Sequence, residues 1–166
     1  MRFWGAPPSI NDRLEGETAL AWAPLPTDRP EVGSWPEDSW LVGTREALWV
    51  VSETATRTPW EAIATAQWDP DTESLAVVGV DHGPARVFVV DQPGRVLELI
   101  RERVTASVVV QRAVAGLRGV SVVARRPPAG GAVTWAVEYP AEVDLSDPDV
   151  TAMVGAAMRA AQAEFD

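Results

Sequence analysis

Short apolar runs separated by turn residues are the feature that most constrains the fold of this chain. Proline, glycine and aspartate interrupt residues 17–91 so often that only short apolar runs remain between them. Runs of this kind predict antiparallel strands, because an amphipathic helix needs a longer uninterrupted segment. We expect strands at residues 18–23, 39–43, 47–52, 74–80 and 86–90, and a long proline-rich loop at 24–38.

Residues 58–68 combine two conflicting patterns. Thr58 and Glu61 have the spacing of a helix capping box, with Pro59 at the first helical position. From Trp60 to Trp68, however, every second residue is apolar, which is the period of a half-buried strand. We expect a strand here, preceded by a single helical turn.

The hydrophobic period changes after residue 92. Val96, Leu97, Ile100 and Val104 lie on one face of a helix that we expect at residues 93–106. The β-branched residues 108–110 favour a strand, and two further strands are expected at 120–125 and 133–139.

A final helix is expected to begin after Ser146 or Asp147, with Pro148 at its first position. Its predicted buried stripe faces the last strands and comprises Val150, Met153, Val154, Ala157, Ala161 and Phe165. The opposite face is small and weakly charged, with candidate protein-contact residues Ala152, Gly155 and Ala156. Small residues let another helix approach closely, so we expect either the helix of residues 96–104 or a second copy of the protein to cover this face.

The order of these elements resembles that of bacterial pleckstrin-homology-like domains of the GRAM type. The resemblance rests on the passages at 40–48 and 59–63 and on the order of 86–90 before 96–100. It implies an α+β fold in which residues 17–106 form a pleckstrin-homology-like antiparallel β-barrel with a capping helix. Outside this range, we expect residues 1–16, with Phe3 and Trp4, to form an irregular N-terminal arm. Residues 107–166 depart from the family pattern, and we expect them to form a small C-terminal β-β-β-α extension packed on the barrel. Passages 104–109 and 120–126 also resemble an uncharacterised actinobacterial family, which implies no function.

The missing residue types exclude several mechanisms. The chain contains no cysteine, no lysine and a single histidine, so thiol chemistry, disulfides, Cys-rich metal sites and Schiff bases are all excluded. His82 lies in a turn, where a general base rarely finds a partner and a pocket. The acidic segments 69–73 and 144–149 lack the pattern of a calcium-binding EF-hand. We therefore predict no catalytic residue, no metal and no cofactor.

The charge distribution is uneven. The chain has 24 acidic and 14 basic residues, a net charge of −10, which disfavours nucleic acid as a partner. Residues 93–136 nevertheless carry an excess of arginine. The candidate anion-binding residues are Arg101, Arg103, Arg112, Arg125 and Arg126. The alternative is that these arginines pair with the acidic flanks of the chain.

Tryptophan is concentrated in the predicted barrel. Six of the eight tryptophans lie between residues 22 and 68, and we expect most of them to fill the core. Trp35 lies in the proline-rich loop, so it either fastens that loop to the domain or belongs to a contact surface.

The sequence favours a non-enzymatic cytoplasmic binding or adaptor module whose partner is another protein or a second copy. No apolar run approaches the roughly 18 residues of a membrane span, so no membrane insertion is expected. The first alternative is binding of a small or peptide anion at the arginine cluster, and the second is a carboxylate-dependent enzyme. A shallow apolar groove would favour the binding module, whereas converging carboxylates in a pocket would favour the enzyme.

Overall fold

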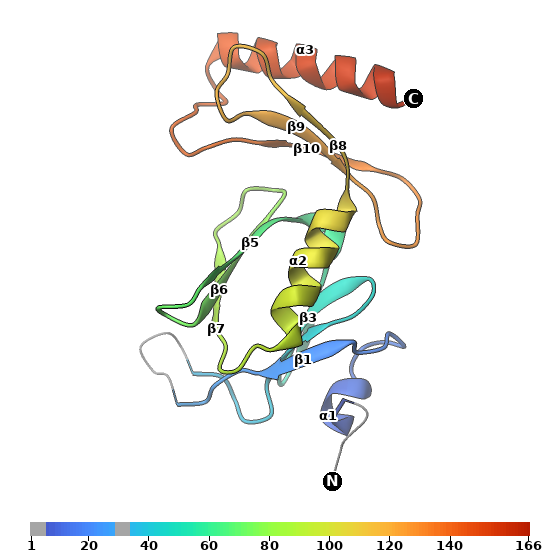
Figure 1. Ribbon diagram of the computed structural model, residues 1–166, viewed down its shortest axis with the longest axis vertical. Coiled ribbons are helices and arrows are strands. Elements are labelled where there is room, and N and C mark those ends of the chain that lie inside the picture. Colours follow the sequence, from blue (N-terminus) through green and yellow to red (C-terminus); the bar gives the residue numbers. More distant parts are fainter. Residues whose placement is uncertain (1–5, 29–33) are drawn as a thin grey trace. The chain divides into compact units, whose positions relative to one another are not determined.

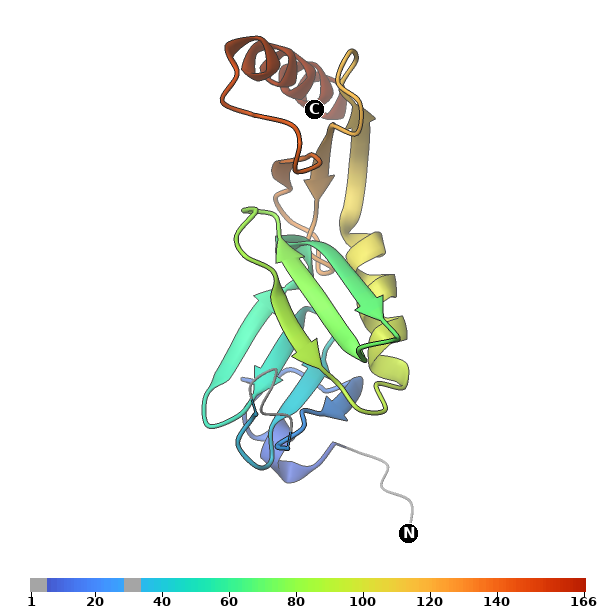
Figure 2. The same cartoon turned by 90° about the vertical axis from the view of Figure 1, so that its left-hand side faces the viewer.

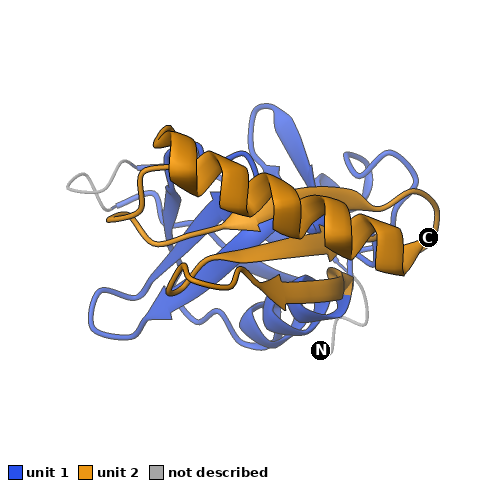
Figure 3. Cartoon of the chain, turned by 90° about the horizontal axis from the view of Figure 1, so that it is seen from above, with its two compact units in different colours: residues 1–106 blue, residues 107–166 orange. Residues whose placement is uncertain are grey.

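The computed structural model describes residues 6–28 and 34–166 of the chain. Phe3 and Trp4, the two aromatic residues of the predicted N-terminal arm, lie outside the described residues. The chain divides into two compact units, residues 1–106 (unit 1) and residues 107–166 (unit 2), which are coloured separately in Figure 3.

The first sheet of unit 1 has four antiparallel strands in the order β1-β2-β3-β4. These strands are β1 (Ala21–Pro24), β2 (Trp40–Gly43), β3 (Ala47–Val51) and β4 (Ala55–Pro59). Each consecutive pair is joined by a hydrogen-bonded ladder, which leaves β1 and β4 as the edges (Figure 1). Both edge strands end in proline, which suits an edge because proline has no N–H to donate to a neighbouring strand.

The second sheet of unit 1 has three antiparallel strands in the order β5-β6-β7. These strands are β5 (Ile63–Asp69), β6 (Ser74–Gly79) and β7 (Arg86–Val89). A single 3₁₀ turn, η2 (Trp60–Ala62), separates β4 from β5 and confirms the helical turn before a strand that the sequence predicts. The β5–β6 register shifts between Ile63 and Thr65, directly after η2.

Two cores lie on opposite faces of the first sheet. The main core contains residues from both sheets together with Val96 and Ile100 of helix α2 (Arg95–Ser107), which follows β7 (Figure 2). Trp60 is its largest fully buried side chain, with no exposed surface. The outer core contains Val42, Trp49 and other alternate residues of β2 and β3. Alternation along a strand sends successive side chains to opposite faces, which is why one sheet supports both cores.

The described residues before β1, 6–20, include a helical turn and are partly buried. Residues Pro8–Asn11 form the helical turn α1, with proline at its start. Ile10 and Leu14 are completely buried in the outer core. These two apolar side chains cover the face of the first sheet that would otherwise be open to water.

Unit 2 is one three-stranded antiparallel sheet with a helix on one face (Figure 1). Its strands, in the order β10-β9-β8, are β8 (Val108–Ala113), β9 (Ser121–Arg125) and β10 (Thr134–Glu138). The helix is α3 (Pro148–Phe165), and the Asp147 carboxylate accepts the Asp149 N–H as its N-cap. Both the cap and the proline at the first position are as predicted.

Helix α3 packs on the sheet through the face predicted from its sequence. Ala161 is 4 % exposed and shares a core with Val122, Trp135 and Tyr139. The rings of Trp135 and Phe165 meet edge to face, with centroids 5.9 Å apart. The cover over Trp135 and Tyr139 is confirmed, and the predicted stripe is confirmed in part. Met153, Val154 and Ala157 join Ala161 in this core, but only Ala161 is fully buried, and Val150 is half-buried outside the cluster.

The α+β class is confirmed, with three antiparallel sheets and helices in both units. The described strands of unit 1 form two separate sheets and no closed barrel. The pleckstrin-homology-like barrel therefore stays a prediction.

Candidate binding surfaces

An open pocket of about 310 Å³ lies beside Trp35 in unit 1. We call it the Trp35 pocket; it is lined by Trp35, Pro36, Val50, Ser52, Glu53, Thr54, Thr56, Arg86 and Phe88. Trp35 is half-buried and stacks on Phe88 of β7, with ring centroids 6.2 Å apart and planes at 24°. Its backbone N–H donates to the Pro26 carbonyl at 3.2 Å, so the residue is held at both its ring and its main chain.

The polar groups of the Trp35 pocket have opposite charges at its two ends. The Arg86 guanidinium lies 6.0 Å from the centre of the Phe88 ring and donates to the Thr58 hydroxyl at 3.0 Å. Glu53, which is exposed, lies at the turn between β3 and β4. The pocket therefore offers an aromatic floor, a cation at one end and a carboxylate at the other.

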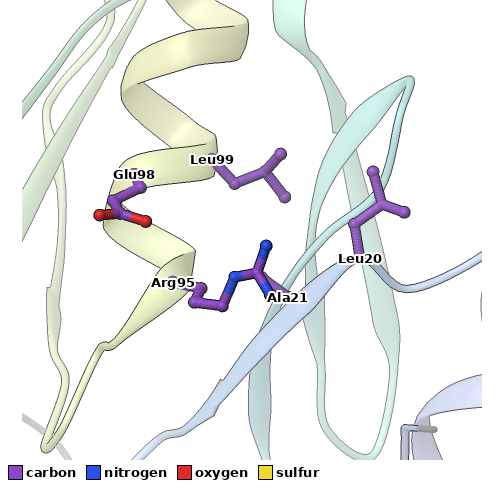
Figure 4. Close-up of a pocket in the computed structure, with 5 residues that line it drawn as sticks. All are labelled: Leu20, Ala21, Arg95, Glu98 and Leu99. Carbon is purple, nitrogen blue, oxygen red and sulfur yellow. The ribbon is translucent and has the colours of Figure 1, made fainter. Parts of the chain in front are cut away.

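A second depression lies between edge strand β1 and the first turn of α2. Two adjoining pockets of about 240 and 230 Å³ share Leu20, Ala21 and Arg95 as lining residues. Figure 4 shows the Arg95 side chain extending toward Ala21, while that of Glu98 points away from it. Leu20, which lines both pockets, is 45 % exposed.

The Glu17 carboxylate accepts three side-chain hydrogen bonds in unit 1. One of its oxygens accepts from the Thr44 hydroxyl at 2.6 Å and the Trp49 indole at 3.1 Å, and the other accepts from Arg57 at 2.6 Å. Burial raises the pKa of Glu17, but the hydrogen bonds from Thr44, Arg57 and Trp49 and the charge of Arg57 outweigh it and hold the pKa below its usual value. Trp49 and Arg57 belong to the first sheet and Thr44 to the turn between β2 and β3, so this network fastens the chain before β1 to that sheet and is structural.

Replacing Glu17 should change how the stability of unit 1 depends on pH. A lowered folded-state pKa contributes stability that is complete above the unfolded value of 4.5 and is lost as the pH falls through the folded pKa. Glu17→Gln should lower the free energy of unfolding by about 2 kcal/mol at pH 7, because it removes charge-assisted hydrogen bonds. It should also reduce the loss of stability that the original chain shows as the pH falls below 4.5. Urea unfolding over a pH series measures both effects. Exposed Glu15→Gln is the control, and an unchanged acid limb in Glu17→Gln would contradict the argument.

The five predicted anion-binding arginines are divided between the two units. Arg101 and Arg103 lie on α2, and the other three lie on strands of unit 2 or directly after one. Arg125 donates to Glu138 at 2.6 Å, and Arg112 lies 3.6 Å from Glu164. Arg126 lies 5.5 Å from the centre of the Phe165 ring. Arg125 and Arg112 therefore have carboxylate partners within unit 2, as the alternative of acid pairing expects, and the anion site stays a prediction.

The small-residue face of α3 is largely exposed. Ala152 and Ala156 are exposed and Gly155 is half-buried. The predicted cover by a second helix or a second copy stays a prediction.

The remaining polar motifs have local structural roles. His82 has a backbone φ of 58° in the turn between β6 and β7. The Ser146 hydroxyl and backbone N–H both donate to the Asp144 carboxylate and lower its pKa. These bonds form a turn that precedes α3, which is the structural role of this acidic segment. Among residues 6–28 and 34–166, no three acidic or histidine side chains are close enough to hold a metal ion.

Comparison with known proteins gives no relative for this chain. No family model matches it, and no match is found among curated proteins or among solved structures. Within the described parts of the chain, no helix is long and apolar enough to span a membrane.

Proposed function

We propose that the chain is a binding module for a protein partner and that the Trp35 pocket of unit 1 holds a segment of that partner. The observation that carries the proposal is the aromatic floor formed by Trp35 on Phe88 within an open pocket of about 310 Å³. Tryptophan and arginine are the residue types that most often dominate the energy of protein interfaces, and this pocket has one of each.

The domain type that we propose for unit 1 is pleckstrin-homology-like. Its support is the element order, in which a four-stranded and a three-stranded antiparallel sheet precede one amphipathic helix. The helix contributes Val96 and Ile100 to the core shared by both sheets. A fold does not define a ligand, so this likeness supports the architecture and the Trp35 pocket carries the functional proposal.

A photo-crosslinking experiment tests this proposal in cells that express the full-length chain. A photoreactive amino acid at Thr56, which is exposed and lines the pocket, should capture a specific partner. Trp35→Ala should lower the yield of that adduct about tenfold or more, because an interface tryptophan usually contributes a large share of the binding energy. Trp35→Phe should retain most of the yield, since phenylalanine keeps a ring against Phe88.

The control places the same photoreactive group at Asp71, an exposed turn residue that does not line the pocket. Circular dichroism of each variant verifies that the protein is folded. An adduct at position 56 that is also formed at position 71, or that Trp35→Ala leaves unchanged, would show that the pocket is not the binding site.

A further inference from the structure

The outer edge of β4 borders the Trp35 pocket and has free main-chain groups. Register pairs Thr56 with Val50 and Thr58 with Leu48, and the Ser52 N–H donates to the Thr54 carbonyl at 2.9 Å. In an antiparallel ladder the residues that exchange hydrogen bonds alternate, so the even-numbered residues of β4 bond to β3. The N–H and C=O groups of Ala55 and Arg57 consequently point away from the sheet, and no backbone bond joins them to any other described segment.

The side chains of β4 alternate in the same way. Arg57 reaches the opposite face of the sheet, where it binds Glu17. Thr54 and Thr56 line the Trp35 pocket, and Thr58 accepts its hydrogen bond from Arg86. Protein edges are usually protected by charged side chains, bulges or a covering segment. On the pocket face of β4, Thr56 is exposed and Thr58 is half-buried, and both are uncharged residues that favour strand pairing.

The edge of β7 lies across the pocket from β4. A hydrogen bond from Arg86 of β7 to Thr58 of β4 joins the two edges. Between this bond and Trp35, both edges border the Trp35 pocket. A strand laid antiparallel along β4 would begin near Arg86 and end near Glu53. Its residues opposite Thr58, Thr56 and Thr54 would face the pocket, because directly opposed residues share a face.

We propose that the partner segment binds by strand addition, as an extended peptide paired antiparallel with β4. This inference rests on the proposed function, because it specifies how the segment occupies the Trp35 pocket. Main-chain hydrogen bonds to Ala55 and Arg57 supply affinity, and pocket-facing side chains supply specificity. The charges of the pocket select an acidic residue beside Arg86, an apolar residue against the aromatic floor and a basic residue beside Glu53, each separated by one residue.

A defined peptide tests the pairing directly. The probe is fluorescein-labelled Thr-Glu-Thr-Leu-Thr-Lys-Thr, whose binding to the full-length chain is measured by fluorescence anisotropy. Ala55→Pro removes the outward N–H of β4 without removing a bond to β3, and it should weaken binding about tenfold. Ala55→Val keeps that N–H and is the matched control, with affinity expected within about twofold of the original chain.

The charge order of the peptide tests its direction. The exchanged sequence Thr-Lys-Thr-Leu-Thr-Glu-Thr places like charges beside Arg86 and Glu53, so it should bind about tenfold more weakly. Equal or tighter binding of the exchanged peptide would overturn the antiparallel arrangement. Absence of saturable binding of both peptides up to about 1 mM, or equal affinity in Ala55→Pro and Ala55→Val, would overturn strand addition.

The two proposals fail in different experiments. If Trp35→Ala abolishes the adduct at position 56 while Ala55→Pro leaves its yield unchanged, the pocket binds a partner by another mode and strand addition is wrong. If Trp35→Ala leaves the adduct unchanged, the functional proposal itself is wrong. Thermal melting of Ala55→Pro verifies that any loss of binding does not come from unfolding.

Discussion

Replacing Trp60 by alanine should cost about 4 kcal/mol of the free energy of unfolding of unit 1. Trp60 has no exposed surface and lies in the core shared by both sheets and α2. Its indole N–H donates to the Thr44 carbonyl at 3.0 Å, so the substitution also leaves a buried acceptor without its donor. Both the cavity and the lost hydrogen bond act in the same direction.

Trp60→Phe separates these two contributions. Phenylalanine fills much of the cavity but has no N–H, so this variant should cost clearly less than Trp60→Ala. Urea denaturation followed by native-state hydrogen exchange measures the loss, and exchange assigns it to β2, β3 and η2. A loss below about 1 kcal/mol in Trp60→Ala would mean that Trp60 does not join the two sheets.

The elements with strong local signals were predictable from the sequence. The change from period two to period 3.6 after residue 92 locates α2, because Val96 and Ile100 repeat at helical spacing and both are buried. Asp147 and Pro148 locate the start of α3 for an equally local reason, since each satisfies a requirement of a helix N-terminus. Such signals depend on neighbouring residues alone.

Strand β4 shows why other elements were not predictable. Its residues read Ala-Thr-Arg-Thr-Pro and the first three are exposed, so no alternation of apolar and polar side chains is present. Its strand conformation comes from pairing with β3, which is a contact between segments rather than a property of the segment. The burial of Ile10 and Leu14 is likewise decided by the outer face of the first sheet.

The candidate site was predictable only in part. Trp35 is conspicuous in the sequence because it interrupts a polar, proline-rich loop, and it does line a pocket. Phe88 and Arg86 carried no such signal, because an apolar strand with one arginine is ordinary and their role depends on β4 and Trp35 lying opposite them. A site assembled across strands has no spacing in the sequence from which to infer it.

The second large effect is expected in unit 2, for Val122→Asp. Val122 has no exposed surface and lies in the core between β9 and α3, together with Ala161. A carboxylate placed there is buried, and Arg112, which is opposite position 122 in the β8–β9 ladder, already lies 3.6 Å from Glu164. The variant must therefore bury a charge, draw Arg112 away from Glu164 or take up a proton. We expect a loss of about 4 kcal/mol near neutral pH, which is enough to remove most of the protection of β8–β10 from hydrogen exchange.

The pH dependence identifies the cause of this loss. Burial raises the folded-state pKa of the introduced carboxyl, so the variant should be least destabilised below the unfolded pKa of about 3.9 and increasingly destabilised as the pH rises through the folded value. Val122→Asn, which is polar but does not ionise, should show no such dependence. Val109→Asp places the same group on β8 at a valine that is 39 % exposed, and it should cost less than about 1 kcal/mol because water solvates the charge. Equal losses at positions 109 and 122 would mean that α3 does not exclude water from the sheet of unit 2.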